Sequence, residues 1–280
     1  MNPPRVLVTG GTGVLGRRVV ECLGSEGIKA RILSRSGKPG TMKGDLRTGE
    51  GLEPAVQGVV TIIHCASSPF RKAHQVDVEG TGRLLEVAAE AGVSHLAYIS
   101  IVGIDRAASY PYYRIKLETE RVVESSPVPY TIVRATQFYD LVLMAMRCLD
   151  RLPVMVVPRG FLGQPIDAGE VAECLVDLVL SGPAGHVPDI GGPEVRILAD
   201  AARGYLRAKG SQRRIFEVPV PDKTARAFRE GALVCPDRAY GKIRWEDFLR
   251  PRIATGKEVI PFRAIDVTTP PPPPPTRGIR

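Results

Sequence analysis

The sequence is poor in the residue types that build disulfide-stabilised or metal-stabilised folds. Its 280 residues include 5 cysteines, 4 histidines and 1 tryptophan. The cysteines stand singly, without the paired spacing of a zinc site or a disulfide framework, so we expect reduced thiols and no bound metal. Their positions are Cys22, Cys65, Cys148, Cys174 and Cys235.

Long hydrophobic runs are also missing from the chain. No apolar stretch approaches the roughly 20 residues that a membrane-spanning helix needs, and the first residues lack the features of a cleavable signal. We therefore expect a cytoplasmic protein with no membrane partner.

Basic residues outnumber acidic ones and give a formal net charge of +8. The lysines and arginines are spread along the chain without an aromatic-basic cluster or a DNA-binding motif, so we expect no nucleic-acid partner. The hydrophobic fraction of 44% and the charged fraction of 24% are typical of a globular protein. A chain of this length builds one sizeable core, or one core with an appended lobe.

A series of glycines follows the first apolar segment. Residues 6–8 are apolar without polar alternation, which predicts a strand buried on both faces. Glycines at a turn from strand to helix permit unusual backbone angles and a close approach to phosphate, and the N–H groups at the helix start bind that anion. We expect this loop to hold a dinucleotide diphosphate through Gly10, Thr12, Gly13, Val14, Leu15 and Gly16.

Two segments of the chain resemble a known family. Residues 9–16, Thr-Gly-Gly-Thr-Gly-Val-Leu-Gly, resemble the glycine motif of the extended and atypical short-chain dehydrogenases/reductases. Residues 128–138, Val-Pro-Tyr-Thr-Ile-Val-Arg-Ala-Thr-Gln-Phe, are similar to the NmrA-like NAD(P)-binding branch of that superfamily. The resemblance extends over most of residues 5–250.

The resemblance implies an α/β fold of the Rossmann type, with a doubly wound parallel sheet, helices on both faces and a small C-terminal α/β lobe. We expect an NAD(P)-binding Rossmann domain at residues 1–140. A small substrate-binding lobe, interwoven with the Rossmann core, is expected at 141–262. A proline-rich tail at 263–280 is expected to be disordered.

The end of the second expected strand, residues 28–33, favours NADP over NAD as the cofactor. Dehydrogenases that prefer NAD usually place an acid there, whereas a 2′-phosphate needs cations and hydroxyl donors. This chain has Ser34 and Arg35, and Arg17 and Arg18 add positive charge at the start of the first helix. The alternative is that the three arginines are solvated surface residues.

The resemblance implies further contacts with the dinucleotide. It places Asp45 and Leu46 beside the adenine, although Asp45 can equally cap a helix or a turn. It also implies a turn of small residues over the cofactor, made by Cys65, Ala66 and Ser67.

We assign no chemical role to two features near that turn. His64 and Cys65 are adjacent on an expected strand and therefore point to opposite faces, so we do not expect a nucleophilic pair. The amphipathic segment 76–92 predicts a long helix that serves as a scaffold beneath the cofactor.

The segment after the sixth expected strand is predicted to border the nicotinamide. The resemblance implies that Thr136 contacts the cofactor and that Gln137 and Phe138 line the substrate pocket. Met144 is a further pocket candidate, because methionine adapts to irregular apolar cavities, although an ordinary core position explains it equally. Arg134 is interpreted as a structural ion-pair residue.

Tyr112 and Lys116 stand four residues apart, in a segment whose helix is predicted to start at Pro111. Residues at this spacing project from one face, and an ammonium beside a phenol lowers the pKa of the phenol. The resemblance makes Tyr112 the proton donor to a carbonyl, Lys116 a ligand of the nicotinamide ribose and Ser100 the third catalytic residue. The alternatives are a surface pair of little energetic weight and Tyr113 as the acid.

These observations support two hypotheses of different classes. The first is an NADP-preferring oxidoreductase that moves hydride between NADPH and a small carbonyl or quinone-like substrate. The second is a non-catalytic NADP(H) sensor that acts through a protein partner, because NmrA-like proteins often lose the tyrosine and bind NADP without demonstrable turnover. An epimerase or dehydratase that uses the same tyrosine as a base is a third alternative.

Overall fold

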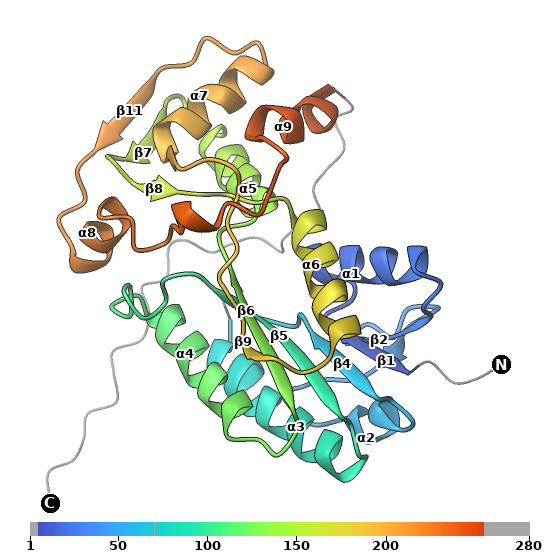
Figure 1. Ribbon diagram of the computed structural model, residues 1–280. Coiled ribbons are helices and arrows are strands. Elements are labelled where there is room, and N and C mark those ends of the chain that lie inside the picture. Colours follow the sequence, from blue (N-terminus) through green and yellow to red (C-terminus); the bar gives the residue numbers. More distant parts are fainter. Residues whose placement is uncertain (1–4, 70, 255–280) are drawn as a thin grey trace, which may run out of the picture.

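The computed structural model describes residues 5–69 and 71–254. Seven strands form one parallel sheet in the order β3-β2-β1-β4-β5-β6-β9 (Figure 1). They are β1 (Val6–Thr9), β2 (Ala30–Ser34), β3 (Met42–Lys43), β4 (Thr61–His64), β5 (His95–Ile101), β6 (Tyr130–Ala135) and β9 (Gly185–His186). The strand order reverses between β1 and β4, and parallel α/β sheets bind their ligands in the crevice at such a point.

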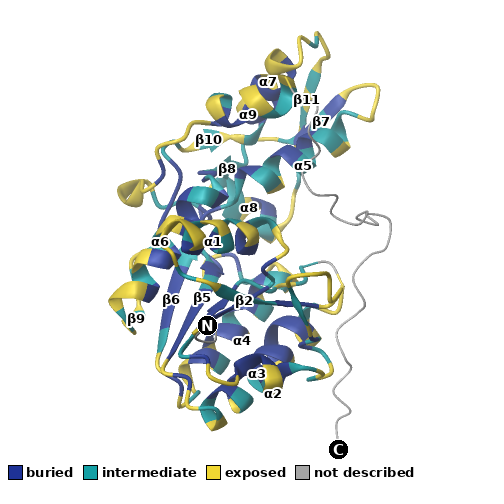
Figure 2. Cartoon of the chain, turned by 90° about the vertical axis from the view of Figure 1, so that its right-hand side faces the viewer, coloured by how far each residue is buried: buried dark blue, intermediate teal, exposed yellow. Residues whose placement is uncertain are grey.

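Helices cover both faces of the sheet, which explains why β1 is apolar throughout. They are α1 (Val14–Ser25), α2 (Leu52–Val56), the π-helical turn η1 (His74–Glu79), α3 (Gly80–Glu90), α4 (Pro111–Glu124) and α6 (Ala168–Ser181). Val6 and Val8 pack into a core with α1 and α6, whereas Leu7 packs into a core with α2, α3 and α4. Figure 2 shows this burial along the strands and on the helix faces turned towards them.

A smaller lobe lies beyond the carboxyl end of β6 (Figure 1). Its elements are α5 (Tyr139–Leu149), β7 (Met155–Pro158), β8 (Leu162–Gly163), β10 (Arg196–Ile197), α7 (Leu198–Ala208), β11 (Ile215–Val218), α8 (Lys223–Arg229), η2 (Pro236–Arg238) and α9 (Trp245–Ala254). Strand β7 pairs with β11 in parallel and β8 pairs with β10 antiparallel. The core of the lobe includes Tyr139, Trp245 and Phe248, with the Tyr139 ring centroid 5.4 Å from Trp245 and 5.0 Å from Phe248.

The observed architecture confirms the predicted fold class, a doubly wound parallel sheet with helices on both faces and an appended lobe. The boundaries at residues 140 and 262 stay predictions, and the proline-rich segment 263–280 lies outside the described residues. None of the helices within 5–69 and 71–254 is long and apolar enough to cross a membrane.

Two local features differ from the expectation. The helix predicted over residues 76–92 begins with the π-helical turn η1 and continues as α3. Strands β8 to β11 were not predicted from the sequence, because none of their residues is buried and they lack the uninterrupted buried run that marks β1.

Candidate functional site

The glycines of the loop after β1 are required by close backbone contacts. Gly10 has a φ of +64°, and a Cβ there would lie 2.8 Å from backbone atoms of Ala66. A Cβ on Gly16 would lie 2.3 Å from the carbonyl oxygen of Gly10. A side chain at either position would therefore separate the loop from its neighbours.

The start of α1 offers backbone donors to an anion. Gly13 is the N-cap residue and supplies no side-chain cap, and Thr12 and Gly13 are both exposed. The first turn of this fully described helix contains no acidic residue. Its unpaired N–H groups and its dipole favour a negative group at the edge of the crevice. The loop geometry therefore fits the diphosphate of a dinucleotide.

The end of β2 carries the residues predicted to select the cofactor. Ser34 is buried, with its Oγ 3.0 Å from Ser36 Oγ, and Arg35 is exposed. The nearby Asp45 carboxylate accepts hydrogen bonds from Arg47, which lower the pKa of Asp45, and the charge of Arg35 lowers it further. The carboxylate of Asp45, near Arg35, is thus already paired with the guanidinium of Arg47. The sequence analysis did not single out Arg47.

Other residues of the predicted adenine and phosphate side have structural contacts. Leu46 is buried in the core that contains Leu7. Arg18 lies 2.9 Å from Glu21 and Arg17 lies 4.0 Å from the same carboxylate, with all three side chains about half exposed. These ion pairs favour the surface interpretation for Arg17 and Arg18, whereas the cofactor contact of Leu46 stays a prediction.

The His64 and Cys65 pair does not form a nucleophilic centre. Thr9 Oγ1 lies 2.6 Å from His64 Nδ1, and Thr81 Oγ1 lies 2.9 Å from Nε2. Burial, and then the charge of Lys116, lowers the pKa of His64 to about 3. Burial raises the pKa of the Cys65 thiol to about 12. The histidine is therefore a neutral core residue and the thiol stays protonated, as expected.

The Tyr112 hydroxyl meets the turn after β4 at the crevice. Its oxygen lies 2.5 Å from Ser67 Oγ, which donates a hydrogen bond of 2.7 Å to Asp77 Oδ1. The other carboxylate oxygen of Asp77 accepts from Ser68 N at 2.9 Å. Asp77 belongs to η1 and is 1% exposed. The structure thus brings together Tyr112 and Ser67. It adds Asp77, which the sequence analysis regarded only as part of a scaffold helix.

Lys116 lies on the same helix as Tyr112 but is directed elsewhere. Its Nζ donates to the hydroxyl of Tyr98 and, at 3.1 Å, to the carbonyl of Ile99, both on β5. Burial lowers the pKa of Lys116, opposed by the charge of Asp77. The expectation that Lys116 lowers the pKa of Tyr112 is wrong for this structure, because burial and then Asp77 raise it well above the ordinary value.

Two further candidates for the catalytic group have contrasting surroundings. Ser100 is 3% exposed and its Oγ has no hydrogen-bond partner among the described residues. A buried polar atom without a partner is rare and is typical of a site that binds a ligand or water. Tyr113 instead packs between Tyr110 and Phe228, at centroid distances of 4.9 Å and 6.2 Å. This packing favours Tyr112 over Tyr113 as the acid.

The segment after β6 fixes the lobe to the sheet. Thr136 Oγ1 donates to the Gln164 carbonyl at 2.5 Å, and Gln137 Nε2 donates to the Leu233 carbonyl at 2.9 Å. Phe138 packs on the core beside α6, and Met144 is half-buried on α5. The side chains of Thr136 and Gln137 are thus engaged by the backbone of the lobe. The predicted contacts of all four residues with cofactor or substrate stay predictions.

Arg134, on β6, forms a two-pronged ion pair. Its Nε and Nη2 lie 2.9 Å and 2.6 Å from the two carboxylate oxygens of Glu120, a buried residue of α4. The interpretation of Arg134 as a structural ion-pair residue is confirmed.

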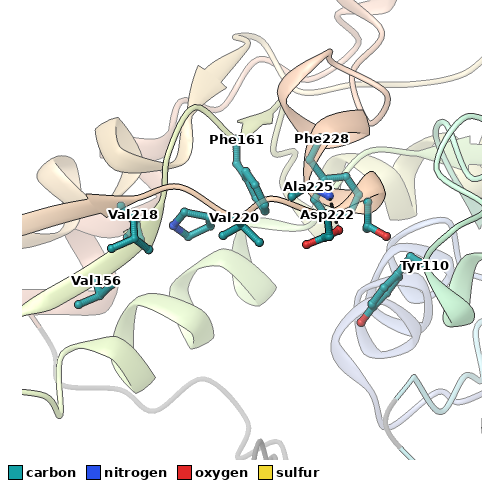
Figure 3. A pocket seen from close by; sticks show the side chains of 11 residues that line it. Tyr110, Val156, Phe161, Val218, Val220, Asp222, Ala225 and Phe228 are labelled. Atoms are coloured by element: carbon teal, nitrogen blue, oxygen red, sulfur yellow. Dashed lines mark hydrogen bonds between the residues drawn. The ribbon is translucent and has the colours of Figure 1, made fainter. Parts of the chain in front are cut away.

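An apolar pocket of about 430 Å³ adjoins the start of α4 (Figure 3). Tyr110, the N-cap residue of α4, stands on one side, and the lobe supplies the other walls. Its one carboxylate belongs to Asp222, which caps α8 by accepting from Ala225 N at 2.9 Å. The lining residues of the lobe include Val156, Phe161, Val218, Val220 and Phe228. The predicted pocket residues Gln137, Phe138 and Met144 do not line it.

Comparison with known proteins agrees with this geometry. A family model described as NAD(P)H-binding matches residues 10–181, which include the glycine loop, Ser67, Asp77, Tyr112 and Lys116. The chain belongs to the NAD(P)H-binding family. This membership confirms the resemblance to the NmrA-like, atypical short-chain dehydrogenases/reductases.

Known proteins of similar sequence carry different names. The photosystem II assembly factor Ycf39 of Synechocystis sp. is 31% identical over 235 residues, which cover 77% of this chain and 71% of the relative. The (4-alkanoyl-5-oxo-2,5-dihydrofuran-3-yl)methyl phosphate reductase of Streptomyces griseus is 27% identical over 229 residues, 77% of either chain.

Solved structures of the same fold include redox enzymes and a dehydratase. An NADPH-dependent quinone oxidoreductase of Escherichia coli aligns with a TM-score of 0.70 at 17% identity, over 87% of this chain and 98% of that chain. The NDP-hexosamine 5,6-dehydratase TunA aligns with a TM-score of 0.72 at 18% identity, over 91% of this chain and 99% of that chain. At these identities the likeness shows the shared fold alone.

The sequence analysis missed Asp77, Tyr98 and Arg47. Asp77 had a detectable signal, because it stands three residues before Gly80 and seven before Leu84, on the buried stripe of the helix. An acid on an otherwise apolar stripe indicates a specific partner. Tyr98 and Arg47 gave no comparable signal. The role of Tyr98 depends on Lys116, which is distant in sequence, and the role of Arg47 depends on the turn that brings it to Asp45.

Proposed function

We propose that this protein is an NADP-preferring oxidoreductase that transfers hydride between NADPH and a small carbonyl or quinone-like substrate. The observation that carries the proposal is the position of the Tyr112 hydroxyl beside Ser67, in the turn that also contacts Gly10 of the phosphate loop through Ala66. This places a candidate proton donor beside the turn that packs against the glycine loop, which supports the proposal.

The residues suited to hold the cofactor are spread along the crevice. The N–H groups at the start of α1 suit the diphosphate, and Ser34 and Arg35 suit the 2′-phosphate of NADP. Lys116 is proposed to hold the nicotinamide ribose. When bound, the nicotinamide supplies or accepts the hydride, which no side chain of the protein can do.

Tyr112 is proposed to supply the proton. The phenol carries its proton at neutral pH and can donate it to the more basic alkoxide that forms from a carbonyl, although its raised pKa makes it a weaker acid than a free phenol. In carbonyl reduction the O–H proton passes to the substrate oxygen as the carbonyl carbon receives hydride, and Tyr112 is left as a phenolate. Ser67, whose hydroxyl proton is directed to Asp77 before the reaction, can then turn that proton towards the phenolate oxygen.

The apolar pocket beside Tyr110 favours a substrate with an apolar portion. Tyr110 forms one wall of this pocket and stands two residues before Tyr112, which does not itself line the pocket. Burial of apolar area in such a pocket stabilises binding by about 25 cal/mol for each Å² removed from water.

The experiment is single-turnover oxidation of NADPH in the presence of quinones, aldehydes and ketones, each tested with and without an apolar chain. We expect wild type to oxidise NADPH, Tyr112→Phe to bind NADPH with wild-type affinity but to react about a hundred-fold more slowly, and apolar chains to improve turnover. Tyr240→Phe, which changes an exposed tyrosine of the lobe, is the matched control. Equal rates for wild type and Tyr112→Phe would refute the role of Tyr112.

The second candidate function is a non-catalytic NADP(H) sensor that acts through a protein partner. It is favoured by the relatives named as photosystem II assembly factors and by the engagement of Lys116 with Tyr98. Tight NADPH binding without oxidation by any substrate, together with a partner that binds only one redox state of the complex, would support it. For either function we propose a cytoplasmic location, since a reducing compartment keeps the five single cysteines as thiols.

A further inference from the structure

A buried carboxylate without an assigned role lies behind the proposed acid. Asp77 Oδ1 accepts from Ser67 Oγ at 2.7 Å and lies 3.4 Å from the Tyr112 hydroxyl oxygen. Asp77 Oδ2 accepts from the backbone N–H of Ser68 at 2.9 Å. A charged carboxylate that is 1% exposed is costly to bury unless such donors satisfy it. These contacts therefore indicate a specific arrangement around Asp77.

The hydrogen bonds have a defined polarity. An ionised carboxylate only accepts, so the single hydroxyl proton of Ser67 is directed to Asp77. Ser67 Oγ must then accept from Tyr112, whose oxygen lies 2.5 Å away. The line from Tyr112 through Ser67 to Asp77 thus fixes the position of the phenol oxygen.

The π-helical turn accounts for the position of Asp77. η1 spans His74–Glu79 and precedes α3 without a break, so Asp77 sits in a single widened turn at the start of a long helix. Such turns are rare and occur frequently at functional sites. The turn presents the carboxylate to the loop after β4 and to α4.

The ionisable groups around Tyr112 come from three elements. Asp77 lies on η1, Tyr113 is its neighbour on α4, and Tyr98 lies on β5 with Lys116 bonded to its hydroxyl. The negative charge of Asp77 opposes ionisation of Tyr112, whereas a hydrogen bond from Ser67 stabilises the phenolate. The two residues thus act on the phenol in opposite directions.

We propose that Asp77 is a positioning residue, which through Ser67 holds the Tyr112 phenol in one orientation and whose negative charge keeps the proton on the phenol oxygen. The proposal rests on the proposed function, in which Tyr112 is the acid. Oxidation of an alcohol needs the phenolate of Tyr112 as a base, so the proposal predicts that alcohol oxidation rises only at high pH.

The first test is spectrophotometric titration of tyrosinate in the cofactor-free protein, with the signal of Tyr112 identified by its loss in Tyr112→Phe. In Asp77→Asn we expect Tyr112 to ionise at lower pH than in wild type, and in Ser67→Ala at higher pH. Ser68→Ala is the matched control, since the Ser68 hydroxyl bonds the Arg71 carbonyl and Asp77 uses only the Ser68 backbone N–H. Titration of Tyr112 at the wild-type pH in both Asp77→Asn and Ser67→Ala would overturn the proposal.

The second test is single-turnover reduction of the substrate found for wild type. Asp77→Asn and Ser67→Ala are expected to reduce it about a hundred-fold more slowly, because a displaced acid loses its alignment. Asp77→Asn, which changes no residue of the cofactor turn, is expected to keep the wild-type affinity for NADPH. In Asp77→Asn the pH profile of alcohol oxidation is expected to move to lower pH, and an unmoved profile at wild-type rates would contradict the proposal. If Asp77→Asn does not fold, the rate of Ser67→Ala alone tests the proposal. Ser67 is exposed, so we expect Ser67→Ala to fold.

The two tests separate this inference from the proposed function. Failure of wild type to oxidise NADPH with any substrate would refute the oxidoreductase, whereas the titration would still decide whether Asp77 and Ser67 control the proton of Tyr112.

Discussion

Gly16 lies directly against Gly10, so that a Cβ on Gly16 would stand 2.3 Å from the Gly10 carbonyl oxygen. Real Cβ atoms essentially never approach an atom this closely, and the atom in question is backbone and cannot rotate away. The first turn of α1 can therefore pack under the loop after β1 only if residue 16 is glycine. The same contact positions the N–H groups that the loop offers to a diphosphate.

Gly16→Ala is expected to weaken NADPH binding at least ten-fold and to destabilise the fold by about 1–3 kcal/mol, the usual cost of overpacking. Fluorescence titration with NADPH and urea unfolding measure the two effects. Gly24→Ala is the matched control, because Gly24 lies on the same helix with nothing within 4 Å of the new Cβ. The control should bind NADPH normally and gain up to about 1 kcal/mol of stability. Wild-type binding by Gly16→Ala would show that the loop does not hold the cofactor.

Arg35→Asp is expected to reverse the cofactor preference. Loss of a charged hydrogen bond should weaken NADPH relative to NADH by about 1.5–3 kcal/mol, measured as the ratio of the two dissociation constants. Arg5→Asp makes the same change of charge at an exposed residue before β1. Arg5 lies at the amino ends of the parallel strands, whereas Arg35 lies at their carboxyl ends, so Arg5→Asp should leave the ratio of the two dissociation constants unchanged. An unchanged ratio in Arg35→Asp would exclude this residue from the 2′-phosphate site.

His64 is expected to make the fold sensitive to mild acid. Its pKa is about 3 in the folded protein and near the ordinary 6.5 in the unfolded chain. Between these values the unfolded chain binds a proton that the folded protein does not, so stability falls as the pH is lowered, by about 1.4 kcal/mol for each pH unit. Above about pH 6.5 both states are neutral and the effect vanishes.

Urea unfolding from pH 7 to pH 4 measures this dependence, with the fluorescence of Trp245 as the signal. His64→Asn removes the titrating group and should show a shallower decline than wild type. His186→Asn is the control, because His186 is exposed and pairs with Glu124, and its decline should parallel that of wild type. Parallel declines for wild type and His64→Asn would mean that His64 titrates normally in the fold.

The sequence predicted those parts of the site that depend on local rules. The strand, glycine loop and helix around Gly10 were predicted because glycine spacing and apolar runs are local signals. The hydrogen-bond partners of Tyr112 and Lys116 were not predicted. Helical spacing shows which residues share a face of the helix, but it does not show which side chains the neighbouring strand presents to that face. Tyr98 on β5 engages Lys116, and Asp77 on η1 reaches Tyr112 through Ser67. Both contacts depend on the register between elements far apart in sequence.

The ion pair of Arg134 with Glu120 is expected to stabilise the junction of β6 and α4. Glu120 is 3% exposed, so Arg134→Met leaves a buried carboxylate without its cation and should cost about 3 kcal/mol in urea unfolding. The double variant Arg134→Met with Glu120→Leu removes both charges and should recover most of that loss, because apolar residues of similar size replace buried pairs at little cost. A double variant as unstable as the sum of the two single variants would show that the pair is not coupled. The contribution of Arg134 would then come from packing of its side chain, or from the carboxylate of Asp105 at 3.6 Å.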